Sequence, residues 1–180
     1  YSLQPPLRLK TVLCDYNTTR IKLRQIQIQI TGKGKITMDW LTHTFKPYID
    51  THYRTLADRE HTFIAGSSMG GLMSIYALLY YNQFFSRAAA LSPSLWIAPN
   101  DSMQMIRRSR PLSGSILYMD YGSREMKQHR KMDQAFAQAA NLLLDKNIYL
   151  NCRIVPDGEH CEASWEQQIP FFMNTLMYNL

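Results

Sequence analysis

The clearest hydrophobic pattern lies in residues 24–30, where isoleucine and glutamine alternate. Alternation with a period of two predicts a half-buried strand whose isoleucines, Ile26, Ile28 and Ile30, share one face. Glycines at 32 and 34 end this pattern, and residues 9–15 form another short strand-like run. Four further apolar runs of strand length lie at 61–65, 87–92, 115–121 and 148–155. The run 61–65 is mostly apolar on successive positions, which is typical of a strand buried on both faces.

Helical patterns separate these strands. Residues 38–55 carry apolar side chains at four-residue spacing, with Thr37 as the expected N-cap and Pro47 as the expected site of a kink. Three more helices are expected at 70–81, at 101–109 with Asn100 or Asp101 as cap, and at 128–145 with Met132, Phe136 and Ala139 inward, before a last one that ends near Tyr178. Strands that alternate with helices indicate βαβ units, so the sequence predicts an α/β fold with a mainly parallel sheet.

Length and composition describe one folded domain. The chain has 180 residues, of which 46% are hydrophobic and 19% charged, and it can bury an ordinary core. No apolar run approaches the ~18–20 residues that a membrane-spanning helix needs, so we expect no membrane partner. Residues 1–10 contain two prolines and no apolar stretch of signal-peptide length. We therefore expect a cytoplasmic protein, and prior removal of a leader would make it a secreted or periplasmic one.

The positive charge is concentrated at the amino terminus. The net charge is +6, and residues 1–35 hold seven Lys and Arg side chains against one Asp, so the remainder of the chain is neutral. A basic stretch can contact nucleic acid, but such a surface is usually interleaved with aromatic residues. Here Tyr1 and Tyr16 are the only aromatics. The segment is therefore interpreted as solvated surface, and no nucleic-acid partner is expected.

The motif that indicates chemistry is Gly66-Ser67-Ser68-Met69-Gly70, which fits G-x-S-x-G. A strand-like run precedes it and a helix-compatible run follows it, which is the context that a nucleophile elbow requires. Side chains in place of the two glycines should collide with neighbouring backbone. The elbow would expose the Oγ atom of Ser68 and direct the helix N-terminus at a developing oxyanion, with the Met69 N–H as one donor.

A serine nucleophile needs a base, and His160 is the best-placed of the five histidines. It lies in a loop directly after the last predicted strand, and such a loop returns to the nucleophile's side of the sheet. His43, His52 and His61 precede the nucleophile, and His129 lies at a polar helix start, so each is interpreted as structural or solvated.

Two carboxylates compete for the role of the acid that orients the base. Asp120 lies near the end of the strand 115–121, and Glu125 lies in the loop that follows. Local reasoning does not separate them. Three cysteines without a C-x-x-C pair give no zinc or redox motif, and no metal or organic cofactor is expected.

About residues 39–170 resemble the esterase family of α/β hydrolases that includes enterobactin-type siderophore esterases, S-formylglutathione hydrolase and feruloyl esterases. The resemblance rests on motifs in the family's order: Lys46-Pro47-Tyr48-Ile49-Asp50 with Tyr53-Arg54-Thr55, Gly66-Ser67-Ser68-Met69-Gly70-Gly71-Leu72, Leu91-Ser92-Pro93-Ser94, Asp120-Tyr121-Gly122-Ser123-Arg124-Glu125, and Gly158-Glu159-His160 with Trp165.

The resemblance implies an α/β-hydrolase fold with helices on both faces of the sheet and a Ser68–His160–Glu125 triad. The family places its acid at the fourth position of a G-x-x-[D/E] turn, which selects Glu125 over Asp120. It also makes Trp96, which follows Ser-Pro-Ser, a candidate wall of the substrate cleft. The implied activity is hydrolysis of a small-molecule carboxylic ester through an acyl-enzyme, with siderophore-type esters as the first expectation.

The sequence departs from the family at its amino terminus. Residues 37–180 are family-like, but residues 1–36 show no His-Gly loop of the kind that supplies a second oxyanion donor in the family. We therefore expect N-terminal strands to be missing or replaced and activity to be weakened. Strand 24–30 or a second copy in a homodimer would cover the sheet edge left bare. The alternative expectation is a catalytically impaired hydrolase fold that binds or assembles.

Overall fold

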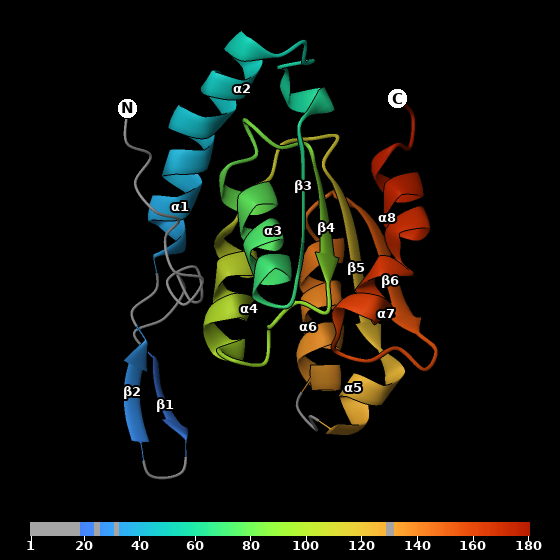
Figure 1. Ribbon diagram of the computed structural model, residues 1–180. Helices are drawn as coiled ribbons and strands as arrows, with labels where there is room; N and C mark the ends of the chain where they lie inside the picture. Colours follow the sequence, from blue (N-terminus) through green and yellow to red (C-terminus); the bar gives the residue numbers. More distant parts are fainter. Residues whose placement is uncertain (1–18, 24–25, 31–32, 129–131) are drawn as a thin grey trace.

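The computed structural model describes residues 19–23, 26–30, 33–128 and 132–180 (Figure 1). The strand expected over residues 9–15 lies outside the described residues. The centre of the molecule is a four-stranded, wholly parallel sheet of order β3-β4-β5-β6, formed by β3 (Phe63–Ser67), β4 (Arg87–Leu91), β5 (Ile116–Gly122) and β6 (Tyr149–Val155). The predicted parallel α/β fold is confirmed, and each of these strands lies within two residues of its predicted bounds.

Helices cover both faces of this sheet (Figure 1). The helices of the described residues are α1 (Gly34–Trp40), α2 (Lys46–His52), α3 (Met69–Tyr80), α4 (Pro99–Arg108), α5 (Ser123–Gln128), α6 (Met132–Leu144), α7 (Glu162–Glu166) and α8 (Ile169–Leu176), and α3, α4, α6 and α8 provide most of the packing against the sheet. Alternate residues of β4 belong to two different cores: Ala88 and Ala90 pack with α3, α4 and α6, whereas Ala89 and Leu91 pack with α8. Successive strand residues point to opposite faces, so one sheet separates the two cores.

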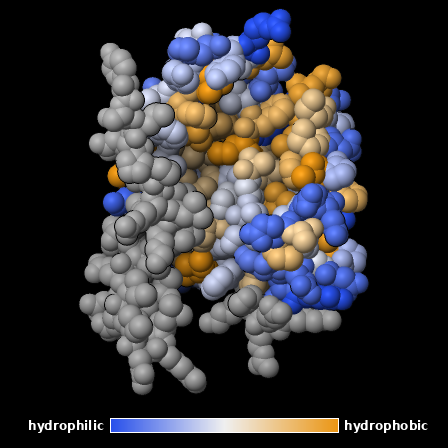
Figure 2. Space-filling model, viewed as in Figure 1, coloured by the Kyte–Doolittle hydropathy of each residue, from blue (hydrophilic) through white to orange (hydrophobic). Residues whose placement is uncertain are grey.

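Strand β3 differs from its prediction as a strand buried on both faces. Four of its five residues are only half-buried and Ala65 is exposed. The reason is topological: β3 pairs with β4 alone and forms an edge of the sheet. An apolar groove of about 500 Å³ lies between β3 and the helical segment 34–52, and Figure 2 shows hydrophobic surface in this region.

The helical segment before β3 runs as α1, a π-helical turn over Leu41–Phe45, and α2. Pro47, the expected site of a kink, lies in the first turn of α2 directly after the π-helical turn, and a proline lacks the N–H that a regular helix would use there. Thr37 was expected as the N-cap, but the helix begins at Gly34, four residues earlier than expected, with Lys33 as cap. The Thr37 hydroxyl instead donates to the Lys33 carbonyl oxygen, 3.3 Å away.

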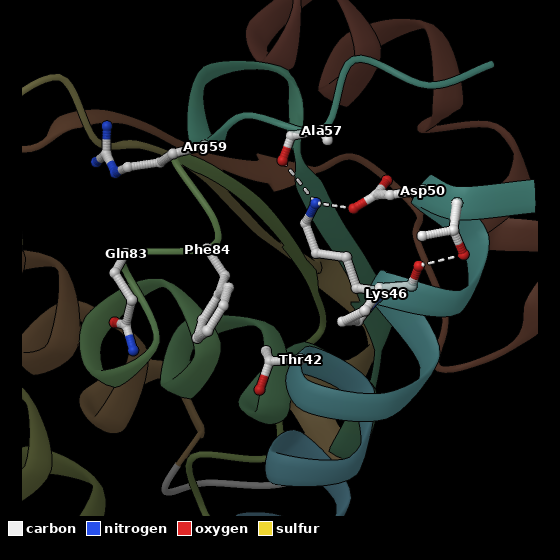
Figure 3. Close-up of a pocket in the computed structure, with 9 residues that line it drawn as sticks. Thr42, Lys46, Asp50, Ala57, Arg59, Gln83 and Phe84 are labelled. Atoms are coloured by element: carbon white, nitrogen blue, oxygen red, sulfur yellow. Dashed lines mark hydrogen bonds and ion pairs between the residues drawn. The ribbon is translucent and has the colours of Figure 1, made fainter. Parts of the chain in front are cut away.

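A lysine ties α2 to the loop that follows it (Figure 3). The Lys46 Nζ atom donates to Asp50 Oδ2 at 2.6 Å and to the Ala57 carbonyl oxygen at 2.7 Å. The nearby Arg59 donates to the Asn82 carbonyl oxygen and to Ser115. Lys46 and Arg59 are the two cations that line this cavity of about 380 Å³. Because both already bind protein groups, we interpret the cavity as part of the structure rather than as a binding site.

The remaining predictions for helices have mixed outcomes. Helix α6 buries Met132, Phe136 and Ala139 as expected, although it begins at Met132, after a separate α5. Helix α4 begins at Pro99 with Ala98 as its cap, so the caps Asn100 and Asp101 were wrong. Proline suits the first helical position because it has no N–H to leave unbonded.

The amino-terminal part of the described chain is a hairpin. Strand β1 (Thr19–Leu23) pairs antiparallel with β2 (Ile26–Ile30) in a two-stranded sheet of its own, with Ile21 opposite Ile28. The strand expected at 24–30 is thus observed over Ile26–Ile30, and residues 24–25 lie outside the described residues. Strand β2 does not join the sheet edge at β3, so the expectation that it extends this edge was wrong. Whether its isoleucines are covered stays a prediction.

Candidate active site

Ser68 stands at a sharp turn between β3 and α3. Its backbone has φ 56° and ψ −117°, a conformation that a residue with a side chain rarely adopts. Two backbone hydrogen bonds join the turn to the end of β4 and the residues after it. The Ser68 N–H donates to the Leu91 carbonyl oxygen at 2.8 Å, and the Ser94 N–H donates to the Ser68 carbonyl oxygen at 3.0 Å. This is the geometry of a nucleophile elbow.

The glycines of the motif have different roles from those predicted. A Cβ on Gly66 would lie 2.5 Å from the Gly70 carbonyl carbon, which confirms the expected collision at this position. At Gly70 the expectation was wrong, since a Cβ there would meet nothing within 4 Å. The crowded glycine after the serine is Gly71, where a Cβ would lie 2.9 Å from the Leu91 carbonyl oxygen. The elbow therefore packs against the end of β4 through Gly71.

The structure brings together the predicted nucleophile, base and family-selected acid. The distance from Ser68 Oγ to His160 Nε2 is 2.9 Å, and that from His160 Nδ1 to Glu125 Oε2 is 2.6 Å. Glu125 is 1% exposed, whereas the His160 side chain is 33% exposed. An unbroken chain of hydrogen bonds thus runs from a buried carboxylate to a serine hydroxyl at the surface.

Asp120 does not take part in this chain. Its Oδ2 atom accepts from the Tyr118 hydroxyl at 2.8 Å, and its Oδ1 atom accepts from the Ser92 N–H at 3.1 Å. Burial raises the pKa of Asp120 to about 6, although both hydrogen bonds act in the opposite direction. Asp120 is therefore a buried acid beneath the site, while Glu125 contacts His160.

The environment of Glu125 favours its ionised form. Burial alone would raise the pKa of Glu125, but hydrogen bonds from His160, from the Ser92 hydroxyl and from the Gly122 N–H together lower it below its ordinary value. Both of the last two donors bind Oε1, at 2.6 Å and 2.9 Å. Oε2 is thereby left to His160.

Two loops are joined where Glu125 and His160 meet. The Arg124 N–H donates to the Gly158 carbonyl oxygen at 3.0 Å, and the Asp157 N–H donates to the Ser123 hydroxyl at 2.9 Å. The Arg124 guanidinium also binds Glu159 at 2.9 Å, in an exposed ion pair. These contacts fix the loop after β6 against the start of α5, and this fixes His160 relative to Glu125.

Met69 and Trp96 were the other predicted site residues. Met69 is the first residue of α3, so its N–H is among those that a helix leaves without an intrahelical partner. Trp96 lies two residues beyond Ser94 and is 37% exposed. Their roles as oxyanion donor and substrate wall stay predictions.

Sequence reasoning missed the contacts of two residues that it had quoted as part of the family motifs. The Ser92 hydroxyl binds Glu125, and the Trp165 indole N–H donates to that hydroxyl at 2.9 Å. The Trp165 ring also meets the His160 ring edge to face, with centroids 5.0 Å apart. The only signal in the sequence was the Ser-Pro-Ser motif and a tryptophan after the histidine. Neither shows which side chains these residues contact.

Two negative findings concern the described ranges only. Within them, no three His, Cys, Asp or Glu side chains are grouped so that they could hold a metal ion. Every helix in these ranges is too short or too polar to span a bilayer.

Comparison with known proteins identifies the family. Residues 23–173 match the family model described as "Putative esterase", and the chain belongs to this family. A curated relative, the uncharacterized protein YbbA of Bacillus subtilis, is 24% identical over 103 residues, which are 57% of this chain and 41% of YbbA.

Solved structures show the same fold. The IroE-like serine hydrolase of Shewanella oneidensis superposes with a TM-score of 0.71 at 20% identity, over 94% of this chain and 55% of that one. The siderophore hydrolase EstB of Aspergillus nidulans gives 0.65 at 16% identity, over 89% and 64%. The ferric enterobactin esterase of Salmonella typhimurium gives 0.60 at 21%, over 76% and 36%. The chain thus spans less than two thirds of each of these relatives.

Proposed function

We propose that this protein is a serine carboxylic-ester hydrolase that works through an acyl-enzyme on Ser68. The observation that carries the proposal is the hydrogen-bond chain from Ser68 Oγ through His160 to Glu125, with distances of 2.9 Å and 2.6 Å. Membership of the esterase family supports the same activity. This evidence does not favour the alternative of an impaired protein that only binds.

Each residue has a distinct chemical role in the proposed mechanism. Ser68 Oγ attacks the ester carbonyl carbon while His160 Nε2 accepts its proton, and His160 then gives this proton to the leaving alcohol. Water attacks the acyl-enzyme in the second half-reaction, again with His160 as base. Glu125 holds the Nδ1–H tautomer and stabilises the imidazolium. The Met69 N–H donates to the oxyanion. These steps need no metal or organic cofactor.

The proposed substrates are small-molecule esters of the siderophore type. The support is the naming of several structurally similar proteins as siderophore or enterobactin hydrolases. A shallow, mostly apolar depression of about 330 Å³ beside the elbow, lined in part by Leu91, Ile169 and Phe172 and bordered by Glu162 and Glu166, can receive a hydrophobic part of such an ester. We propose Trp96 as a further wall of the substrate site.

We further propose that turnover by this 180-residue chain is low. Removing one oxyanion donor typically lowers kcat by about 100- to 1000-fold. Met69 supplies one donor in the proposed mechanism, and the sequence contains no His-Gly loop to supply another. Hydrolysis of p-nitrophenyl butyrate and of ferric enterobactin measures both the level of activity and the preference.

A covalent label tests the nucleophile without depending on the substrate. A fluorophosphonate should label the wild-type protein at Ser68, and Ser68→Ala and His160→Ala should each abolish labelling. The matched control is Ser67→Ala, which removes the neighbouring hydroxyl of the same motif and should leave labelling intact. Undiminished labelling of Ser68→Ala would overturn the assignment of the nucleophile.

A further inference from the structure

The Ser92 hydroxyl bridges Trp165 and Glu125. The Trp165 Nε1 atom lies 2.9 Å from Ser92 Oγ, which lies 2.6 Å from Glu125 Oε1. The direction of both hydrogen bonds follows from chemistry, because an indole N–H can only donate. Ser92 Oγ therefore accepts from Trp165, and its own proton is directed to the carboxylate.

This arrangement determines which oxygen of Glu125 faces the base. Oε1 accepts hydrogen bonds from both the Ser92 hydroxyl and the Gly122 N–H. These two bonds occupy both lone pairs of Oε1. Oε2 is left with His160 Nδ1 as its partner, at 2.6 Å. Rotation of the carboxylate would break two hydrogen bonds of a group that is 1% exposed.

Trp165 contacts the base as well as the bridge. Its ring meets the His160 ring at an interplanar angle of 84°, with centroids 5.0 Å apart, which is the preferred edge-to-face arrangement. One side chain on α7 thus touches His160 directly and reaches Glu125 through Ser92. The position of Ser92 is itself unusual, since its φ of 46° is left-handed and a glycine would adopt it with less strain.

We propose that Ser92 and Trp165 are positioning residues of the triad, which hold the Glu125 carboxylate and the His160 ring in the orientation that Ser68 requires. This inference rests on the proposed function above. Neither residue touches the reacting atoms; Trp165 acts on Glu125 through Ser92, and Ser92 acts on His160 through Glu125.

Two single variants and their double variant test the bridge. Trp165→Phe removes the indole N–H together with one of the two fused rings while keeping an aromatic side chain beside His160, and Ser92→Gly removes the hydroxyl without adding backbone strain. Because Ser92 donates to a charged group, Ser92→Gly should slow fluorophosphonate labelling and kcat by about 10- to 100-fold, with KM little changed. Trp165→Phe should slow them by about 3- to 10-fold, since its bond to Ser92 is between neutral groups.

The double variant tests whether the two residues act in series. If Trp165 acts on Glu125 through Ser92, the double variant should be no slower than Ser92→Gly. Trp40→Phe is the matched control, because Trp40 is 53% exposed and stacks on Phe45 in the helical segment before β3. It should label at the wild-type rate. Single variants within about twofold of the wild type, or losses that multiply in the double variant, would overturn the inference.

A spectroscopic measurement separates this inference from the proposed function. The proton between His160 Nδ1 and Glu125 should give a far-downfield proton resonance, identified by its loss in Glu125→Gln. This resonance should shift or broaden in Ser92→Gly and Trp165→Phe and stay unchanged in Trp40→Phe. A wild-type protein that neither labels nor turns over ester would refute the proposed function, while the resonance still decides the positioning roles. A resonance unmoved in both variants would refute those roles.

Discussion

Gly122 and Gly158 touch each other backbone to backbone. A Cβ on Gly122 would lie 2.3 Å from the Gly158 carbonyl oxygen, and a Cβ on Gly158 would lie 2.8 Å from Gly122 Cα. Gly122 ends β5, three residues before Glu125, and Gly158 follows β6, two residues before His160. The close approach of these two glycines therefore sets the distance between the acid and the base.

We predict that Gly158→Ala separates the two loops. The added methyl group cannot be accommodated without moving backbone, so we expect a loss of about 1–3 kcal/mol in the free energy of unfolding. Fluorophosphonate labelling should slow by at least about tenfold, because a small misplacement of catalytic groups is enough for a loss of this size or more. Urea denaturation and labelling kinetics measure the two effects.

Arg124→Ala is the comparison for that variant. It removes the exposed ion pairs that Arg124 makes with Glu159 and Asp157, and each such pair contributes less than about 1 kcal/mol. The backbone bond from Arg124 to Gly158 remains. If Arg124→Ala destabilised the protein as much as Gly158→Ala, the ion pairs rather than the glycine contact would be what joins the loops.

We predict that Glu125→Gln reduces turnover far more than Asp120→Asn. Loss of the orienting carboxylate reduces kcat by as much as about 10,000-fold in serine proteases. Asp120 contacts Tyr118 and Ser92 rather than His160, so its variant should retain most of the labelling rate. Labelling rates of the two proteins at pH 8 decide the matter, and a greater loss in Asp120→Asn would reverse the assignment of the acid.

Asp120 and Glu125 should make opposite contributions to the pH dependence of the free energy of unfolding. The pKa of Asp120 is about 6 in the folded protein, above its unfolded value. Its contribution to stability is therefore fully present below about pH 4 and is lost as the pH rises through 6, which amounts to about 3 kcal/mol. The lowered pKa of Glu125 has the reverse effect, because its contribution is present above its unfolded pKa and is lost in acid.

Asp120→Asn isolates the first of these effects. Asparagine does not titrate, so the free energy of unfolding of the variant should decline less than that of the wild type between pH 4.5 and 7. Differences between the two pH profiles, rather than absolute stabilities, give the test, because the amide also changes the hydrogen bonds to Tyr118 and Ser92 independently of pH. Parallel profiles over this range would contradict a raised pKa for Asp120.

The sequence predicted those parts of the site that depend on local pattern. The strand, the serine at a glycine-rich turn and the helix after it are contiguous, so Ser68 could be located from the sequence alone. Strand order and loop position likewise led to His160. The choice of Glu125 over Asp120 needed the family resemblance, because Asp120 lies within β5 and Glu125 three residues after its end, and nothing in the sequence shows which of the two contacts His160.

What the sequence could not predict depends on contacts between distant segments. The half-exposed edge strand β3 follows from the number of strands beside it, and nothing within Phe63–Ser67 encodes that number. The bridge from Trp165 through Ser92 joins residues 73 positions apart. Prediction of the helix cap at Thr37 failed for a local reason, because the residues from Gly34 to Thr37 themselves form the first turn of the helix.

The glycines of the nucleophile motif give the last prediction. We predict that Gly66→Ala and Gly71→Ala each destabilise the protein, because the new Cβ would lie 2.5 Å from the Gly70 backbone in the first and 2.9 Å from the Leu91 carbonyl oxygen in the second. Overpacking of this kind typically reduces the free energy of unfolding by about 1–3 kcal/mol, and contacts with backbone are the hardest to relieve.

Gly70→Ala should behave in the opposite way. Its Cβ would meet nothing within 4 Å, and Gly70 lies in the first turn of α3, where alanine has the higher helix propensity. The variant should therefore be as stable as the wild type or more stable by up to about 1 kcal/mol, because alanine also lowers the entropy of the unfolded chain. Thermal and urea denaturation of the three variants provide the measurement. If all three lost stability equally, the glycines would share one backbone requirement, and the contrast between the crowded and the open positions would be wrong.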